Sequence, residues 1–164
     1  MDALVGAVTP VAAAADRDRA LADLYRREYA GLVRLAHLLT GSNEAAEDLV
    51  QDAFVRLHRS WARADRPAAY LRTTVVNRCR TWQRRQVLER RHRPAPGPAE
   101  AATEARELLD ALTRLGARQR AALVLRYYAD LPETEIAAAL GCRPGTVKSL
   151  LHRGLRRLEE MIDR

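Results

Sequence analysis

Apolar residues recur at helical spacing along most of this chain, and turn residues divide them into separate segments. One apolar stripe, with charged residues opposite, consists of Leu21, Leu24, Tyr25, Leu32, Leu35 and Leu39. Either Ser42 or Asn43 is a suitable N-cap for the segment that follows. The predicted helices cover residues 17–39, 44–61, 68–91 and 104–128, and the last is expected to break at Leu115–Gly116. This pattern predicts an all-α protein.

The last predicted elements are two short helices joined by a tight turn, within residues 131–158. Pro132 is suited to a helix start and Gly141 to a helix end, and a second apolar series begins at Val147. The outward face between those apolar positions is polar and mostly basic, and it carries Arg143, Thr146, Lys148, Ser149, His152, Arg153, Arg156 and Arg157. This pattern is typical of a helix-turn-helix whose second helix enters a DNA major groove. An ordinary helical hairpin with a solvated basic face has the same pattern.

The charge balance favours a polyanionic partner, since the 164 residues carry a formal net charge of +7 and the pI is about 10.2. Lys148 is the only lysine, so the positive charge is almost entirely arginine, whose planar fork suits phosphates and guanine edges. A general arginine bias would give the same composition. The positions of the arginines therefore matter more than their number.

Several classes of protein are disfavoured by what the chain lacks. Cys79 and Cys142 are far apart and the four histidines have no zinc-like spacing, so we expect no metal, no disulfide framework and no cofactor. The acids Asp48 and Asp52 have no nearby nucleophile or histidine pair, and no glycine-rich phosphate loop is present, which argues against an enzyme. The apolar start, residues 1–16, lacks a basic n-region. We expect a disordered leader on a reduced, cytoplasmic protein with no membrane insertion.

Two further helix faces carry candidate binding residues. The polar face of helix 44–61 holds Asp48, Gln51, Asp52 and Arg56, which fits either a plain solvated face or a docking surface for a basic protein. Helix 68–91 interleaves aromatic residues with arginines. That pattern suits contact with unstacked bases, and it equally suits core aromatic residues with a wet basic rim.

Three prolines and a glycine in residues 93–103 exclude a regular element there and predict a linker. The expected architecture is therefore two small helical domains, residues 17–92 and 104–164, joined by a flexible linker. Fully extended, this linker reaches about 35 Å, enough for the two domains to sit on separate DNA segments.

Three stretches in this order resemble an extracytoplasmic-function (group 4) sigma factor of bacterial RNA polymerase, in the sigma-70 family. AEDLVQDAFVRLHRSW, residues 46–61, resembles region 2.2, the helix that docks on the clamp helices of the largest polymerase subunit. AYLRTTVVNRCRTWQRR, residues 69–85, resembles regions 2.3 and 2.4, which melt and read the −10 element. LPETEIAAALGCRPGTVKSLLHRGLRRL, residues 131–158, resembles region 4.2, which reads the −35 element as duplex.

This resemblance implies roles for individual residues. The polymerase-docking positions would be Asp48, Gln51, Asp52 and Arg56. Contacts to the −10 element would come from Asn77, beside a flipped base, and from Arg80, Trp82, Arg84 and Arg85. Contacts to the −35 element would come from Arg143, Thr146, Lys148, Ser149, His152 and Arg153. The implied partners are core RNA polymerase and promoter DNA, and the family also admits an anti-sigma factor, for which no residue argues by itself.

The sequence departs from the family pattern at three positions. Thr81 stands where an aspartate is frequent, Leu150 where an arginine is frequent, and Gly154 where an alanine is usual. Leu150 is expected to remove one DNA contact, and Gly154 to cost about 1 kcal/mol of helix stability. A stand-alone helix-turn-helix regulator remains the main alternative to a sigma factor, but it leaves residues 46–61 and 69–85 without a role.

Overall fold

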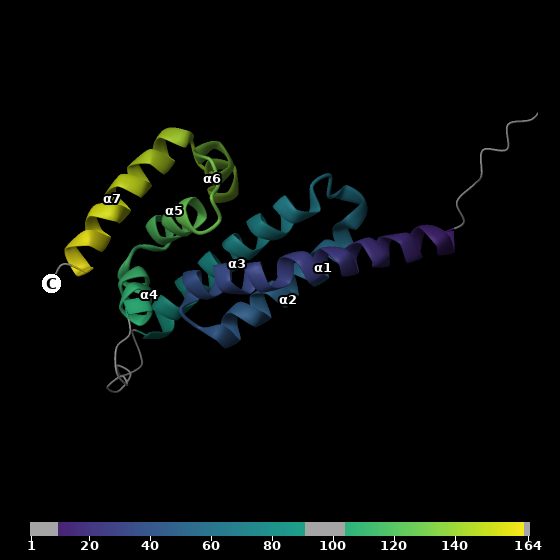
Figure 1. The fold of residues 1–164 in the computed structure, drawn as a ribbon, viewed down its shortest axis with the longest axis horizontal. Helices are drawn as coiled ribbons and strands as arrows, with labels where there is room; N and C mark the ends of the chain where they lie inside the picture. The colour runs from purple at the N-terminus through teal and green to yellow at the C-terminus, as the bar shows by residue number, and fades with distance from the viewer. Residues whose placement is uncertain (1–9, 91–103, 163–164) are drawn as a thin grey trace, which may run out of the picture.

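The computed structural model describes residues 10–90 and 104–162, and these form the helical fold that the apolar spacing predicts. The helices, in order, are α1 (Pro10–Thr40), α2 (Asn43–Ser60), the short 3-10 helix η1 (Trp61–Arg63), α3 (Pro67–Arg90), α4 (Glu104–Arg114), α5 (Ala117–Tyr127), α6 (Glu133–Leu140) and α7 (Pro144–Ile162). No strand occurs in the described ranges. Figure 1 shows α1–α3 as one helical bundle and α4–α7 as a second one beside it.

The first helix begins earlier than expected. Residues 10–16, which we assigned to a disordered leader, form the first turns of α1. The physical reason is the run Ala12–Ala15, because alanine has the highest intrinsic helix propensity and interrupts no helical hydrogen bond. Residues 1–9 of the expected leader, and the expected linker at 93–103, lie outside the described residues.

The N-terminal bundle closes around apolar residues from all three of its helices. Leu39 of α1, Leu57 of α2 and Val75 of α3 are almost completely buried. The turn between α1 and α2 is tight, and the hydroxyl oxygen of Ser42 accepts a hydrogen bond of 3.2 Å from the Ala45 N–H. Ser42 is therefore the N-cap of α2, which fixes the direction in which this helix leaves α1.

The C-terminal bundle contains the predicted helix-turn-helix in α6 and α7. Gly141 ends α6 in the left-handed conformation, with φ of 59°, and its N–H returns to the carbonyls of Ala137 and Ala138. This conformation favours glycine because a Cβ would be strained there. The apolar face of α7 packs on α5, which lies between α7 and the N-terminal bundle (Figure 1).

Gly154 lets α7 approach α5 closely. A Cβ at this position would lie 3.1 Å from Cδ1 and 3.2 Å from Cγ of Leu123, which is itself buried. The glycine at this position therefore has a packing reason that the sequence alone does not reveal.

We expect Gly154→Val to lower the free energy of unfolding by about 1–3 kcal/mol, because the added methyl groups meet the Leu123 side chain. Urea unfolding followed by circular dichroism measures the change. Gly145→Val is a suitable control, since a Cβ there would meet nothing within 4 Å. An unchanged unfolding midpoint for Gly154→Val would contradict the close α5–α7 packing.

Candidate nucleic-acid and protein interfaces

The second helix of the helix-turn-helix presents its polar residues to solvent. All six predicted −35 residues are exposed, with Arg143 just before α7 and the rest in its first three turns: Arg143, Thr146, Lys148, Ser149, His152 and Arg153. The Ser149 hydroxyl donates to the Gly145 carbonyl at 3.2 Å, and Arg153 Nε donates to the Ser149 carbonyl at 3.1 Å. These contacts stay within the helix. The face is therefore open to a ligand along its whole length, as an element that enters a groove must be.

Leu150 does not belong to this outward face. It is buried together with Val147 and Leu151, on the side of α7 that packs into the core. Our expectation that Leu150 removes a DNA contact is therefore wrong for this fold, because the helical phase points the side chain inward. The departure from the family pattern at this position affects packing rather than the outward face.

The predicted −10 residues lie on α3, with different exposures. Asn77, Arg84 and Arg85 are exposed, whereas Arg80 and Trp82 are half-buried. Arg80 Nη1 donates to the Asn77 Oδ1 at 3.5 Å, and Thr81 Oγ1 donates to the Asn77 carbonyl at 3.0 Å. Burial lowers the pKa of Arg80, and the neighbouring Arg118 and Arg84 lower it further. The exposed amide of Asn77 thus stands beside a guanidinium group in a strongly positive environment.

The predicted docking residues lie on α2, and one of them has a second role. Asp48, Gln51 and Arg56 are exposed, but Asp52 is half-buried. The Asp52 Oδ2 accepts from Arg56 Nε at 2.8 Å and lies 2.8 Å from Nε of Arg78 on α3. The hydrogen bond to Asp52 raises the pKa of Arg56. Asp52 therefore ties α2 to α3, and we did not predict the Arg78 contact because no local spacing links positions on different helices.

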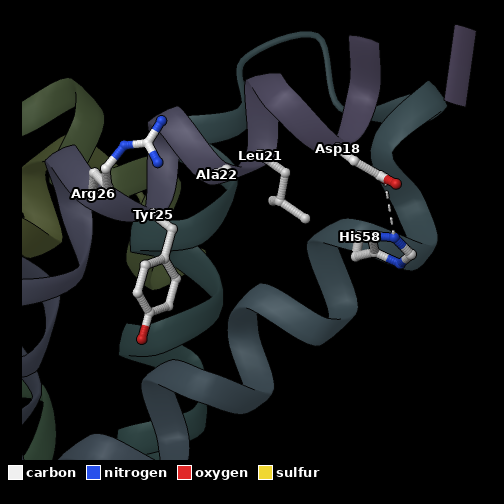
Figure 2. A pocket seen from close by; sticks show the side chains of 6 residues that line it. All are labelled: Asp18, Leu21, Ala22, Tyr25, Arg26 and His58. Carbon is white, nitrogen blue, oxygen red and sulfur yellow. Dashed lines mark ion pairs between the residues drawn. The ribbon is translucent and has the colours of Figure 1, made fainter. Parts of the chain in front are cut away.

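A hollow lies between α1 and His58, which is close to the C-terminal end of α2 (Figure 2). Its volume is about 370 Å³, and Leu21 and Tyr25 face it. The His58 Nε2 lies 3.6 Å from the Asp18 Oδ1 across this hollow. Tyr25 stacks on Tyr29 with ring centroids 4.6 Å apart and leans on Phe54 at 4.9 Å. These contacts join α1 to α2 and explain why an exposed tyrosine is held in one place.

The two bundles contact each other through a buried arginine. Arg120 of α5 is 3% exposed, and its Nε donates to the Leu38 carbonyl at 2.6 Å. Gln83 of α3 donates its side-chain Nε2 to the neighbouring Leu39 carbonyl. Both carbonyls belong to the last turn of α1, where carbonyls have no partner within the helix and the helix dipole is negative. Arg120 thus caps α1 from the other bundle, and burial lowers its pKa to about 10.

Further contacts join the two bundles. Arg34 Nε donates to the Tyr128 hydroxyl at 3.0 Å, and that hydroxyl donates to the Gly31 carbonyl at 3.5 Å. Arg72 of α3 lies 3.9 Å from the carboxylate of Glu135 on α6. Figure 1 shows α5 and α6 beside α3. The two helical domains thus form one closed body, whereas the sequence suggested only two modules on a flexible linker.

The interface also buries Cys79. This residue of α3 is completely buried, and burial raises the pKa of its thiol to about 12, an effect that the nearby Arg120 opposes. Cys142, the other free cysteine, is half-buried.

We expect iodoacetamide at pH 8 to alkylate Cys142 in the folded protein and to leave Cys79 unmodified. A pKa near 12 leaves about a thousandfold less thiolate than an ordinary thiol has, and the thiolate is the nucleophile. Mass spectrometry of tryptic peptides after timed quenching measures both rates. Equal rates at the two cysteines would show that Cys79 is not sealed in the interface.

Comparison with known proteins identifies the class to which these domains belong. A family model described as "Sigma-70 region 2" matches residues 24–88, and one described as "Sigma-70, region 4" matches residues 105–158. The chain belongs to the sigma-70 family. The two matches coincide with the two helical domains, so the predicted all-α, two-domain organisation is confirmed.

Individual relatives narrow the class to the extracytoplasmic-function sigma factors. The RNA polymerase sigma-E factor of Streptomyces coelicolor is 37% identical over 138 residues, which cover 79% of this chain and 78% of that protein. The extracytoplasmic-function RNA polymerase sigma factor SigL of Mycobacterium tuberculosis is 33% identical over 152 residues, covering 82% and 84%. The chain is thus similar to proteins of transcription initiation that associate with RNA polymerase.

One solved structure of a sigma factor has a similar fold. The sigma factor RpoE of Bartonella quintana, crystallised in complex with the anti-sigma factor NepR, is similar with a TM-score of 0.68 and 26% identity. The similarity covers 86% of this chain and 97% of that one. No helix in the described part of the chain is long and apolar enough to span a membrane.

Proposed function

We propose that this chain binds core RNA polymerase through α2 and directs it to promoters, with α3 reading the −10 element and α7 reading the −35 element. The observation that carries this proposal is the division of exposed polar groups between the two sigma-70 domains. The exposed side of α2 carries a ridge of acidic and amide groups, formed by Asp48, Gln51 and Asp52. An exposed asparagine among arginines lies on α3, and a basic face lies on α7. Promoter recognition needs no catalytic group from this chain. We place the chain in the cytoplasm, where promoter DNA lies.

The α3 surface suits a single strand. Asn77 offers both a donor and an acceptor to the edge of an unpaired base, and it is exposed on the helix. Arg84 and Arg85 lie two turns further along, where their guanidinium groups can hold the adjacent phosphates. Flipping a base out of the duplex costs a few kcal/mol, which such contacts offset.

The α7 surface suits a duplex. Its exposed residues comprise Lys148, then His152 and Arg153 one turn further along, and Arg143 and Thr146 at the N-terminal end. The N-terminal part of a recognition helix is the part that reaches base edges in the major groove. Phosphate contacts by the arginines make binding weaken steeply as salt rises.

Promoter recognition by both domains requires the closed body to open. Arg80 is half-buried, and the Arg72–Glu135 ion pair joins α3 to α6, so part of the −10 face is covered by the C-terminal domain. In the proposed mechanism polymerase binds the opened form and holds the two domains apart. The free chain then binds promoter duplex weakly.

An anti-sigma factor is the further partner that we propose. The Bartonella quintana sigma factor of similar fold was crystallised with one. A protein that binds both domains of this chain at once would hold them together and hide their polymerase and DNA faces.

We expect Asn77→Ala to lower open-complex formation about tenfold while core polymerase binding stays unchanged, since the variant loses hydrogen bonds to one base. Permanganate footprinting of promoter DNA measures melting, and anisotropy of labelled protein measures polymerase binding. Asn43→Ala, which removes the same amide from an exposed position on α2, is the control. Loss of polymerase binding together with melting would mean that Asn77 acts through the fold.

A further inference from the structure

A groove lies at the junction of the two domains, between the C-terminal half of α3 and the helices α4 and α5. Its volume is about 650 Å³, within the range of pockets that hold small organic ligands. Trp82, Val87 and Leu115 supply apolar surface, whereas Gln83, Arg84 and Arg120 supply polar groups. Because the lining comes from both domains, the groove exists only in the closed body.

Two buried polar atoms of this groove lack partners among the described residues. The Nη2 of Arg120 makes no hydrogen bond, although its Nε caps α1, and a Cβ on Gly41 at the groove wall would lie 3.8 Å from it. The Oε1 of Gln83 also makes none, although its Nε2 is bonded. Buried polar groups are normally satisfied, so an unmet donor and an unmet acceptor in one groove indicate a polar ligand.

The charge of the groove indicates the sign of that ligand. The lining holds two cations, the exposed Arg84 and the buried Arg120, against one acid, Asp110. Arg80 and Arg118 add positive charge nearby, since both Arg118 and Arg84 lower the pKa of Arg80. An anion in the groove would relieve repulsion between arginines of the two domains.

We propose that this groove binds a nucleoside phosphate, with its base on Trp82 and its phosphate on Arg84 and Arg120. A base has the flat face that stacks on an indole ring, and exocyclic amines that donate to an amide oxygen such as the Gln83 Oε1. Arginine forks match phosphate oxygens in bidentate fashion. A nucleotide can bond both the Arg120 Nη2 and the Gln83 Oε1. Inorganic phosphate or an apolar molecule cannot bond both.

Binding of the nucleotide would keep the chain in its closed form and so oppose promoter recognition. A ligand that touches both domains stabilises the closed body over the open one by its difference in affinity for the two. It also occupies Trp82 and Arg84, two residues assigned to the −10 strand. This consequence rests on the proposed function, whereas the binding site rests on the groove alone.

Fluorescence of Trp82 tests the site directly. The chain has two tryptophans, so Trp61→Phe leaves Trp82 as the only reporter. We expect the four common nucleoside monophosphates to quench this emission saturably at concentrations up to about 1 mM. Adenosine and inorganic phosphate are the separate probes of base and phosphate. The Trp82→Phe protein, which keeps Trp61, should show no quenching.

Two arginine variants test which residues bind the nucleotide. Arg84→Ala should weaken the nucleotide affinity about tenfold in the Trp61→Phe background, because it removes a charge-assisted contact. Arg114→Ala, an exposed arginine of α4 outside the lining, should leave the affinity within twofold. Equal loss in both variants would mean unspecific attraction of anions and would overturn the proposal.

Two sources of nucleotide are distinguished in the same assay. Quenching by monophosphates supports the nucleotide site, whereas quenching only by a short single strand such as oligothymidylate would reflect the −10 strand contact already proposed for Trp82 and Arg84 and would overturn the nucleotide site. The proposal fails if neither probe quenches Trp82, or if inorganic phosphate displaces the nucleotide at equal concentration. Monophosphate binding needs neither polymerase nor promoter, so a failure of the monophosphates to quench Trp82 would leave the proposed function untouched.

Discussion

The double substitution Asp48→Arg with Gln51→Arg is expected to weaken binding to core bacterial RNA polymerase about a hundredfold. Both residues are exposed one turn apart on α2, and neither side chain takes part in an ion pair or hydrogen bond within the described ranges. The proposed partner surface is basic, so two new cations would face like charge in the contact. A cost of about 1.4 kcal/mol for each substitution gives the expected hundredfold loss. Exposed substitutions of this kind change folding stability by about 0.5 kcal/mol or less.

Fluorescence anisotropy of labelled protein titrated with core polymerase measures this loss. A matched control is Glu104→Arg with Glu107→Gln, which changes the net charge equally at exposed positions on α4. Asp52→Arg, at another of the predicted docking positions, is a poorer probe. It would place a third cation beside Arg56 and Arg78 and disturb the α2–α3 contact. Undiminished binding of the Asp48 and Gln51 double variant would show that α2 does not dock through this ridge.

Arg120→Met is expected to shift the chain toward an open form by about ten- to hundredfold. Methionine preserves much of the side-chain volume but leaves the Leu38 carbonyl without its donor in the closed body, and a buried unsatisfied carbonyl costs about 1–3 kcal/mol. In the open form water can reach that carbonyl. The penalty therefore falls on the closed form alone.

Small-angle X-ray scattering measures the opening as a larger radius of gyration. A second measure is the alkylation rate of Cys79, which should rise when α5 no longer covers α3. Arg118→Met is the control, since Arg118 is an exposed neighbour on the same helix. A radius of gyration equal to that of the unmodified protein would mean that Arg120 does not hold the domains together.

The helices and their outward faces are predictable from sequence because they depend on local spacing. The series Val147, Leu151 and Leu155 sets the phase of α7, and that phase alone exposes Lys148 and His152. Ser42 and Gly141 mark helix ends through chemistry confined to one turn. These features need no knowledge of distant parts of the chain.

The contacts between helices are not predictable in this way. Arg120 is one of many arginines, and nothing in its neighbourhood distinguishes the one that caps α1 from those in solvent. The partner of Asp52 on α3, Arg78, is likewise set by tertiary packing. Leu150 shows the opposite error, because family comparison suggested a DNA-facing position where the helical phase gives a buried one. Local spacing predicts which residues lie on the outer face of a helix. Contacts between helices determine which polar residues are buried.

The role in transcription initiation is tested by binding of the purified chain to core bacterial RNA polymerase, followed by transcription from genomic fragments with and without the chain. We expect stable binding and new transcription start sites, with −10 and −35 elements upstream of them. No binding to polymerase, together with sequence-specific binding of the free chain to duplex DNA at moderate salt, would contradict this role. That result would instead identify a stand-alone helix-turn-helix regulator.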